Sequence, residues 1–128
     1  METKNELRAQ ADKFFEQACA ELKINTMLPD VSFLPERNQK AILAFYKLSV
    51  IIQCVNEDWE PNWQDWDERK YFPWFDVLPA GLGYSYAYYA ASNTLATIGS
   101  RLCYKSAGLS KEWAQKLLPL YEDMLLID

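Results

Sequence analysis

The chain has 128 residues, of which 50% are hydrophobic, 15% aromatic and 24% charged. This length and composition predict one folded domain over residues 1–128 and exclude extended disorder. The sequence contains no histidine, which excludes Ser-His and Cys-His nucleophile pairs and imidazole metal ligands.

The negative charge is concentrated in one segment. Residues 57–76 contain seven acidic and two basic residues, so they carry the whole net charge of −5, and the remainder is neutral. Affinity for duplex nucleic acid depends on Lys and Arg side chains that neutralise phosphates. The charge pattern therefore argues against duplex nucleic acid as a partner.

Targeting signals are not expected. The first twenty residues carry seven charged side chains and no apolar stretch, which argues against a secretory signal peptide. No apolar run approaches the ~18 residues of a transmembrane helix, so we expect no membrane partner. The three cysteines, Cys19, Cys54 and Cys103, are far apart with apolar neighbours, a pattern typical of reduced, buried thiols in a cytosolic protein.

The first predicted element is an amphipathic helix over residues 3–23. Its apolar side chains recur at helical spacing: Leu7, Ala11, Phe14, Phe15, Ala18 and Leu22. A connection over residues 24–35 follows and contains two prolines. We expect Val31, Phe33 and Leu34 of this connection to pack back onto the core.

A second helix is predicted over residues 36–56, after Pro35, because proline suits the first turn of a helix. Its apolar residues are too many for a single stripe: Ile42, Leu43, Phe45, Tyr46, Leu48, Val50, Ile51, Ile52 and Val55. We expect this helix to be central and buried on most sides.

The acidic segment begins as an irregular loop that extends through Arg69, because it combines Pro61 with many Asn and Asp residues. From Lys70, the stretch KYFPWFDVL is rich in strand-forming residues. Pro73 cannot donate a ladder hydrogen bond, so this strand should be an edge strand or a bulged one. Three aromatic side chains of this region are expected in the core: Trp59, Trp74 and Phe75.

Two further strands are predicted after a turn at Gly81 and Gly83. The stretch GYSYAYYAAS alternates and would place three tyrosines on one face: Tyr84, Tyr86 and Tyr88. The alanines over residues 87–96 leave a helix open as an alternative. Asn93 and Thr94 suit a hairpin end, and IGSRLCYK (residues 98–105) resembles a third strand.

The last predicted element is a helix that begins at Ser110 as N-cap, with Leu109 packed on Ala114. Pro119 should kink it near Gln115, whose carbonyl loses its partner. Its apolar face consists of Trp113, Leu117, Leu118 and Tyr121. The element order predicts an α+β fold, in which a three-stranded antiparallel meander packs against two N-terminal helices and one C-terminal helix.

No cofactor and no metal site are predicted. The cysteines lack the CxxC spacing of zinc sites. Asp65 and Asp67 have the first spacing of an EF-hand loop, but Lys70 stands where the turn glycine is required. A looser oxygen site that includes Glu68 and a pair of catalytic carboxylates, as in glycosidases, both stay open as alternatives.

Aromatic residues form the candidate binding site. Exposed Trp63 and Trp66 could anchor a partner protein, or stack on a sugar or a base. The other candidate binding residues lie on the predicted sheet: Tyr84, Tyr86, Tyr88, Arg101 and Lys105. Since no nucleophile, base or metal constellation is present, we expect a non-enzymatic structural or protein-interaction component, with a partner protein or self-association. The alternative is a small ligand-binding module for a glycan or single-stranded nucleic acid.

Four pieces of the sequence, within residues 42–126, support a resemblance to a known family: NEDWEPNWQDWDERKYFPWFDV, GLGYSYAYYA, GSRLCYKS and LYEDMLL. They resemble, in the same order, a family of small proteins encoded by phages and prophages of gut anaerobes, in which typical members read NEGWxPDW, KYYPWF, GSRLCFKS and LYKDF. Asp58, where members often have glycine, and Pro119 depart from that pattern. The resemblance implies a phage-related protein, either virion-associated or acting in the host cytoplasm, and it implies no catalytic residue.

Overall fold

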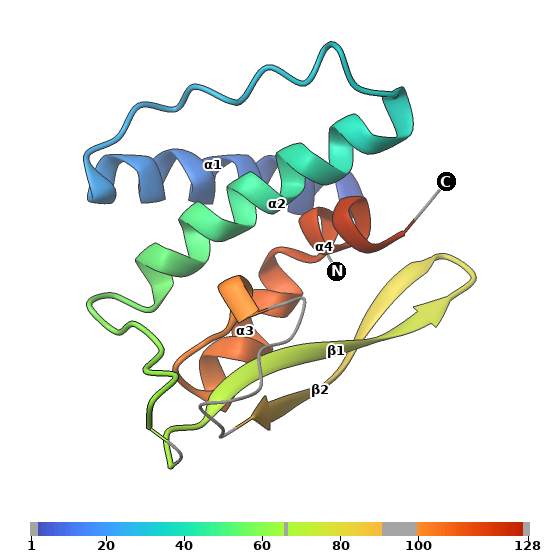
Figure 1. The fold of residues 1–128 in the computed structure, drawn as a ribbon. Coiled ribbons are helices and arrows are strands. Elements are labelled where there is room, and N and C mark those ends of the chain that lie inside the picture. The colour runs from blue at the N-terminus through green and yellow to red at the C-terminus, as the bar shows by residue number, and fades with distance from the viewer. Residues whose placement is uncertain (1–2, 66, 91–99, 127–128) are drawn as a thin grey trace. The chain divides into compact units, whose positions relative to one another are not determined.

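The computed structural model describes residues 3–65, 67–90 and 100–126 (Figure 1). Within them the fold is α+β, with four α-helices, one short 3-10 helix and a two-stranded antiparallel sheet. The chain divides into two compact units, Met1–Cys54 with Lys116–Asp128, and Val55–Gln115. The expectation of a single domain stays a prediction.

Helix α1 (Lys4–Leu22) confirms the first predicted element. It begins at a capping box, in which the Thr3 hydroxyl accepts from the Glu6 N–H at 3.1 Å and the Glu6 carboxylate accepts from the Thr3 N–H at 3.2 Å. It ends at Lys23, whose φ of 58° is left-handed. The buried residues lie at helical spacing on one face: Ala11, Phe15, Ala18 and Cys19.

Helix α2 (Glu36–Val55) packs against α1 in the first unit. The rings of Phe15 and Tyr46 meet edge to face, with centroids 6.0 Å apart, and Lys47 Nζ lies 3.3 Å from Asp12 Oδ1. Its buried residues lie mostly in its C-terminal half: Ala44, Leu48, Val50, Ile51 and Ile52. Ile42 and Phe45, one turn apart in the N-terminal half, are exposed. The expectation that α2 is buried on most sides therefore holds only for its C-terminal half.

The connection between α1 and α2 crosses the first unit as an extended segment (Figure 1). Val31 and Leu34 are half-buried, as expected. Phe33 is 80% exposed, so its expected place in the core is wrong. Residues 32–34 form a turn, closed by the Leu34 N–H that donates to the Val31 carbonyl at 2.9 Å, and Phe33 stands in the middle of this turn.

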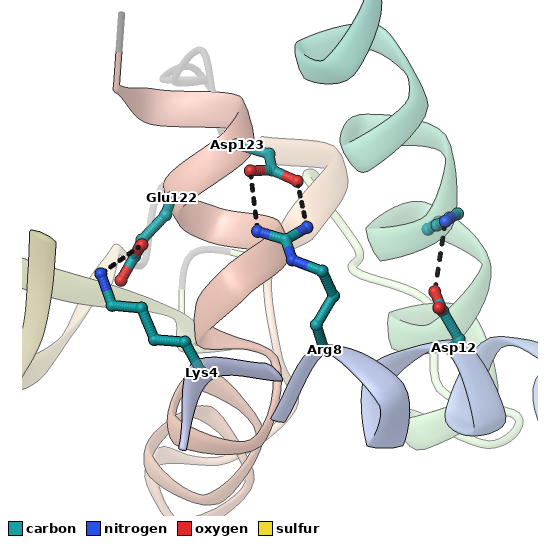
Figure 2. Close-up of polar contacts among 6 residues, drawn as sticks. Lys4, Arg8, Asp12, Glu122 and Asp123 are labelled. Carbon is teal, nitrogen blue, oxygen red and sulfur yellow. Dashed lines mark hydrogen bonds and ion pairs between the residues drawn. The ribbon is translucent and has the colours of Figure 1, made fainter. Parts of the chain in front are cut away.

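Helix α4 (Leu118–Leu125) is joined to α1 by charged side chains. The Arg8 guanidinium donates to both carboxylate oxygens of Asp123, at 2.7 and 3.2 Å, and Lys4 Nζ lies 3.4 Å from Glu122 Oε2 (Figure 2). The hydrogen bond to Asp123 raises the pKa of Arg8. A bidentate pair of this kind fixes orientation as well as charge.

Helix α3 (Ala107–Lys116) begins one turn before the predicted start. The Ser106 hydroxyl accepts from the Leu109 N–H at 3.2 Å and is the cap, whereas Ser110 is buried inside the helix. Pro119 lies in the first turn of α4. Because proline has no N–H for the Gln115 carbonyl, the expected kink is a full break between α3 and α4.

The sheet of the second unit is the hairpin β1 (Lys70–Leu78) and β2 (Gly81–Ala90). Pro79 and Ala80 form the turn, and Gly81 has a φ of 129°, which favours glycine. β1 confirms the predicted first strand, and residues 87–90 of β2 are strand rather than helix. The predicted turn at Gly81 and Gly83 is wrong, because both glycines pair with β1 inside the sheet. The expected hairpin end at Asn93 and Thr94 lies outside the described residues.

The predicted third strand is wrong in its described part. The 3-10 helix η1 spans Ser100–Leu102, and only Tyr104 forms a bridge, exchanging hydrogen bonds of 3.0 and 2.8 Å with Tyr71 of β1. The Tyr71 N–H and C=O point to one edge, so Tyr104 pairs with the edge opposite β2. The next hydrogen-bonded position is Pro73, which cannot donate, and the pairing stops there. The described segment therefore adds to β1, not to β2 as a meander requires.

Asn56, directly after α2, holds the other side of this short segment. Its buried side-chain amide donates to the Cys103 carbonyl at 2.9 Å and accepts from the Lys105 N–H at 3.0 Å. The amide thus supplies the donor and the acceptor that a neighbouring strand would supply. Tyr104 is fully buried between these two sets of bonds.

Candidate functional site

The acidic loop (residues 59–69) is organised around the side chain of Lys70, which has no exposed surface. Its ammonium donates to three backbone carbonyl oxygens, those of Asn62 (2.8 Å), Asp65 (3.3 Å) and Glu68 (3.1 Å). An ammonium has three N–H donors. The charge of Lys70 is therefore fully hydrogen-bonded inside the loop.

Two further side chains surround this ammonium. Glu68 Oε1 lies 3.3 Å from Nζ and also accepts from the Asn62 N–H at 2.6 Å. The ring of Trp63 lies 5.1 Å from Nζ, a cation–π distance. The ring of Trp63, half-buried, thus has a structural role beside any binding role.

Asparagine and aspartate side chains shape the rest of the loop. Asn62 Oδ1 accepts from the Gln64 N–H at 3.0 Å, and Asp65 Oδ1 accepts from the Asp67 N–H at 2.9 Å. These are Asx turns, which replace regular secondary structure. The predicted irregular loop is confirmed, and its carbonyls turn inward while Asp65 and Asp67 stay exposed.

The half of β1 near the turn exposes large apolar side chains. Trp74 is 49% exposed, Val77 75% and Leu78 49%, and Asp76 is also exposed. The expectation that Trp74 lies in the core is wrong, whereas Trp59 and Phe75 are half-buried. In Figure 1 the turn of the hairpin lies at its far end from the acidic loop.

The register of the hairpin divides the tyrosines that were expected on one face. Phe75 pairs with Tyr84 and Trp74 with Tyr86, which leaves Ser85 as a bulge. Because Trp74 and Phe75 are neighbours on β1, positions 84 and 86 belong to opposite faces. The common face is therefore wrong for Tyr84, which is half-buried and whose pKa is raised by desolvation. Position 88 keeps the face of position 86, because it pairs with Phe72.

The remaining predicted binding residues are Trp66, Arg101 and Lys105. Trp66 lies outside the described residues. Arg101 is exposed in η1, and Lys105 is half-buried with Nζ 3.7 Å from Glu57 Oε1. In the described part of the chain, no hydrogen bond, ion pair or ring contact joins Trp63, Arg101 and Lys105 to one another.

The three thiols are unreactive by environment. Cys19 and Cys103 are buried, as predicted, and Cys54 is half-buried. Desolvation raises the pKa of all three, that of Cys103 to about 11. Since the thiolate is the reactive form, such thiols are poor nucleophiles near neutral pH.

The described residues contain neither a metal-binding cluster nor a membrane-spanning helix. Within residues 3–65, 67–90 and 100–126, no cluster of three or more Cys, Asp or Glu side chains is arranged to hold a metal ion. Nor does any helix of these same ranges have the length and apolar character to cross a membrane.

Sequence reasoning missed the two polar residues that organise the second unit. Lys70 had a usable signal, because it is one of two adjacent cations, with Arg69, between an acidic loop and an apolar strand. Asn56 had none, because its sequence context is only that of a helix end. Comparison of the chain with protein-family models, with curated proteins and with solved structures finds no match.

Proposed function

We propose that the protein is a non-enzymatic protein-interaction component and that the hairpin β1–β2 contacts its partner. The observation that carries the proposal is the exposure of Trp74, Val77 and Leu78 on one short element. Clustered exposed apolar side chains are typical of interaction sites, and tryptophan is among the strongest interface residues.

The hairpin is also held firmly at its base, which supports the proposal. Lys70, the first residue of β1, is bonded to the acidic loop, and Tyr71 exchanges two hydrogen bonds with Tyr104. A contact surface that is rigid before binding loses less entropy on association. The bonded base therefore favours a binding role for the exposed half.

The state of the reactive groups favours a non-enzymatic role. Nucleophilic and acid–base catalysis need an accessible group with a suitable pKa. The Lys70 ammonium is buried and fully hydrogen-bonded, the thiol pKa values are raised, and the sequence has no histidine.

The resemblance to phage and prophage proteins supplies the biological setting of the proposal. Virion components and accessory proteins that act in a host cytoplasm both work through protein contacts. A hairpin that presents Trp74 suits either role, and that residue matches the tryptophan of the family pattern KYYPWF.

A photo-crosslinking amino acid at Leu78, which is 49% exposed, tests the proposal in the cell that produces the protein. We expect a discrete adduct, with a partner protein or with a second copy, that disappears in the Trp74→Ser variant. Phe33 provides the control position, because it is 80% exposed and lies in the other unit. The proposal fails when position 78 gives no adduct, or the same adducts as position 33.

The alternative of a glycan or single-stranded nucleic-acid site has less support. The ring of Trp63 lies beside the Lys70 ammonium, and Lys105 is paired with Glu57. Titration with oligosaccharides and oligonucleotides while tryptophan fluorescence is recorded tests it. A shift that is lost in Trp63→Ala but kept in Trp74→Ala would favour this alternative.

A further inference from the structure

We propose that the partner of the hairpin presents a lysine or arginine beside its apolar side chains, and that the Asp76 carboxylate selects for this cation. The inference rests on the proposed function, since it specifies the chemistry of the protein that covers Trp74 and Leu78. It depends on one arrangement, an acid placed between two exposed apolar residues.

Trp74, Asp76 and Leu78 share one face of β1, because side chains of a strand alternate. The cross-strand partner of Asp76 is Gly83, which has no side chain to cover the carboxylate. The Leu78 side chain lies close to Gly83, because a Cβ atom added to Gly83 would stand 2.9 Å from Leu78 Cδ1. The carboxylate thus lies within an apolar patch and faces solvent.

Asp76 has no role within the described structure. No hydrogen bond or ion pair engages its carboxylate in the part of the chain that the structure describes. By contrast, Glu68 and Asp65 of the acidic loop both accept backbone hydrogen bonds. The Asp76 carboxylate is therefore available to an external cation.

A partner that covers Trp74 and Leu78 must also remove water from Asp76. An ionised carboxylate that loses water without gaining a counter-charge opposes binding. A neutral apolar partner would leave Asp76 in that state. A lysine or arginine opposite Asp76 turns the same desolvation into a charge-assisted contact.

The same carboxylate argues against two other occupants of this face. A second copy bound about a two-fold axis would present the same patch, so the two copies of Asp76 would repel each other. An anionic lipid surface would repel it as well. A basic protein segment is also attracted from a distance, because residues 57–76 carry a net charge of −5.

Synthetic peptides in which valine alternates with lysine, glutamate or threonine test the inference. Binding to the full chain is measured by calorimetry at low and at physiological salt. We expect the lysine peptide to bind about tenfold more tightly than the threonine peptide, and the glutamate peptide to bind least. Trp74→Ser should abolish binding of the lysine peptide.

Two variants of equal net charge separate the effect of the Asp76 carboxylate from the effect of the acidic segment as a whole. Asp76→Asn should weaken binding of the lysine peptide about tenfold, whereas Asp58→Asn, at another exposed acid of the same unit, should change it less than about twofold. Circular dichroism confirms that each variant folds. Equal effects of the two variants would overturn the inference, since they would show attraction to the acidic segment as a whole.

The other outcomes distinguish the inference from the proposed function. If the threonine peptide binds as tightly as the lysine peptide and Trp74→Ser abolishes both, the hairpin is a contact surface but does not select a cation. If no peptide binds, or Trp74→Ser changes nothing, the inference is overturned, and the adduct at Leu78 judges the proposed function alone. A dimer in light scattering that Trp74→Ser dissociates would identify a second copy as the occupant instead.

Discussion

Replacing Lys70 with methionine should destabilise the second unit by about 3–5 kcal/mol, the range for breaking a buried, hydrogen-bonded charge. The variant keeps most of the apolar stem but removes the ammonium. Three carbonyl oxygens lose their donor, and the Glu68 carboxylate loses the cation at 3.3 Å. Three hydrogen bonds to a charged group are worth about 1.5–3 kcal/mol each, but water that enters the loop recovers part of this.

Urea unfolding followed by tryptophan fluorescence measures the effect. All five tryptophans lie in Val55–Gln115, so their emission reports on the unit that contains the loop. A loss of 3–5 kcal/mol is a large share of the roughly 5–15 kcal/mol of a typical domain. We expect a clear fall in the urea midpoint.

Two further variants make the test specific. Lys111→Met removes an exposed lysine of the same unit and should change stability by less than about 0.5 kcal/mol. Lys70→Arg keeps the charge but replaces a compact ammonium with a planar fork, so it should fall between wild type and Lys70→Met. A Lys70→Met protein within about 0.5 kcal/mol of wild type would refute the structural role of the ammonium.

Other predictions concern the second unit. Asn56→Ala should cost about 2–4 kcal/mol by urea unfolding, because it leaves the Cys103 carbonyl and the Lys105 N–H buried without their partner; a loss below about 1 kcal/mol would contradict this role. Ser110→Ala should stabilise by about 1 kcal/mol, since the buried Ser110 hydroxyl has no hydrogen-bond partner in the described structure and alanine favours a helix; a lower melting temperature would count against it. The pKa of Cys103 is raised from 9.0 to about 11 by burial, so the unfolded chain loses its thiol proton first. The stability that the protonated Cys103 thiol adds to the folded state is fully present below pH 9.0 and is lost as pH rises through about 11. This loss of folding free energy is at most about 1.4 kcal/mol per pH unit. Unfolding at several pH values should therefore show a shallower decline in Cys103→Ala than in wild type, and identical slopes would exclude this effect.

Local signals predicted most of the elements. The spacing of apolar residues located α1 and α2 within one or two residues at each end, because helix formation and burial of one face are both read from neighbours in sequence. The strand at Lys70–Leu78 was also predicted from local composition, and the second strand was predicted two residues later than the observed Gly81–Ala90. Pro119 ended a helix for a reason contained in its own covalent structure.

The misplaced features depend on partners distant in sequence. The predicted third strand failed because its pairing is with Tyr71, beside a proline that cannot donate. The tyrosine face was divided by a bulge at Ser85, and a shift of one residue reverses every side chain beyond it. Trp74 was expected in the core from its hydrophobicity, yet hydrophobicity does not say which half of a strand is covered.

The candidate site shows the same division between local and tertiary information. Sequence alone determined that the segment around Trp63 is acidic, aromatic and irregular, and that histidine chemistry is absent, because these follow from composition. Only the tertiary structure decided that Lys70 turns into the loop, that Trp63 covers it, and that Trp74, Asp76 and Leu78 face solvent. The physical reason is that burial and hydrogen bonding depend on which distant groups meet, and the same lysine or tryptophan would be stable in water or in a core.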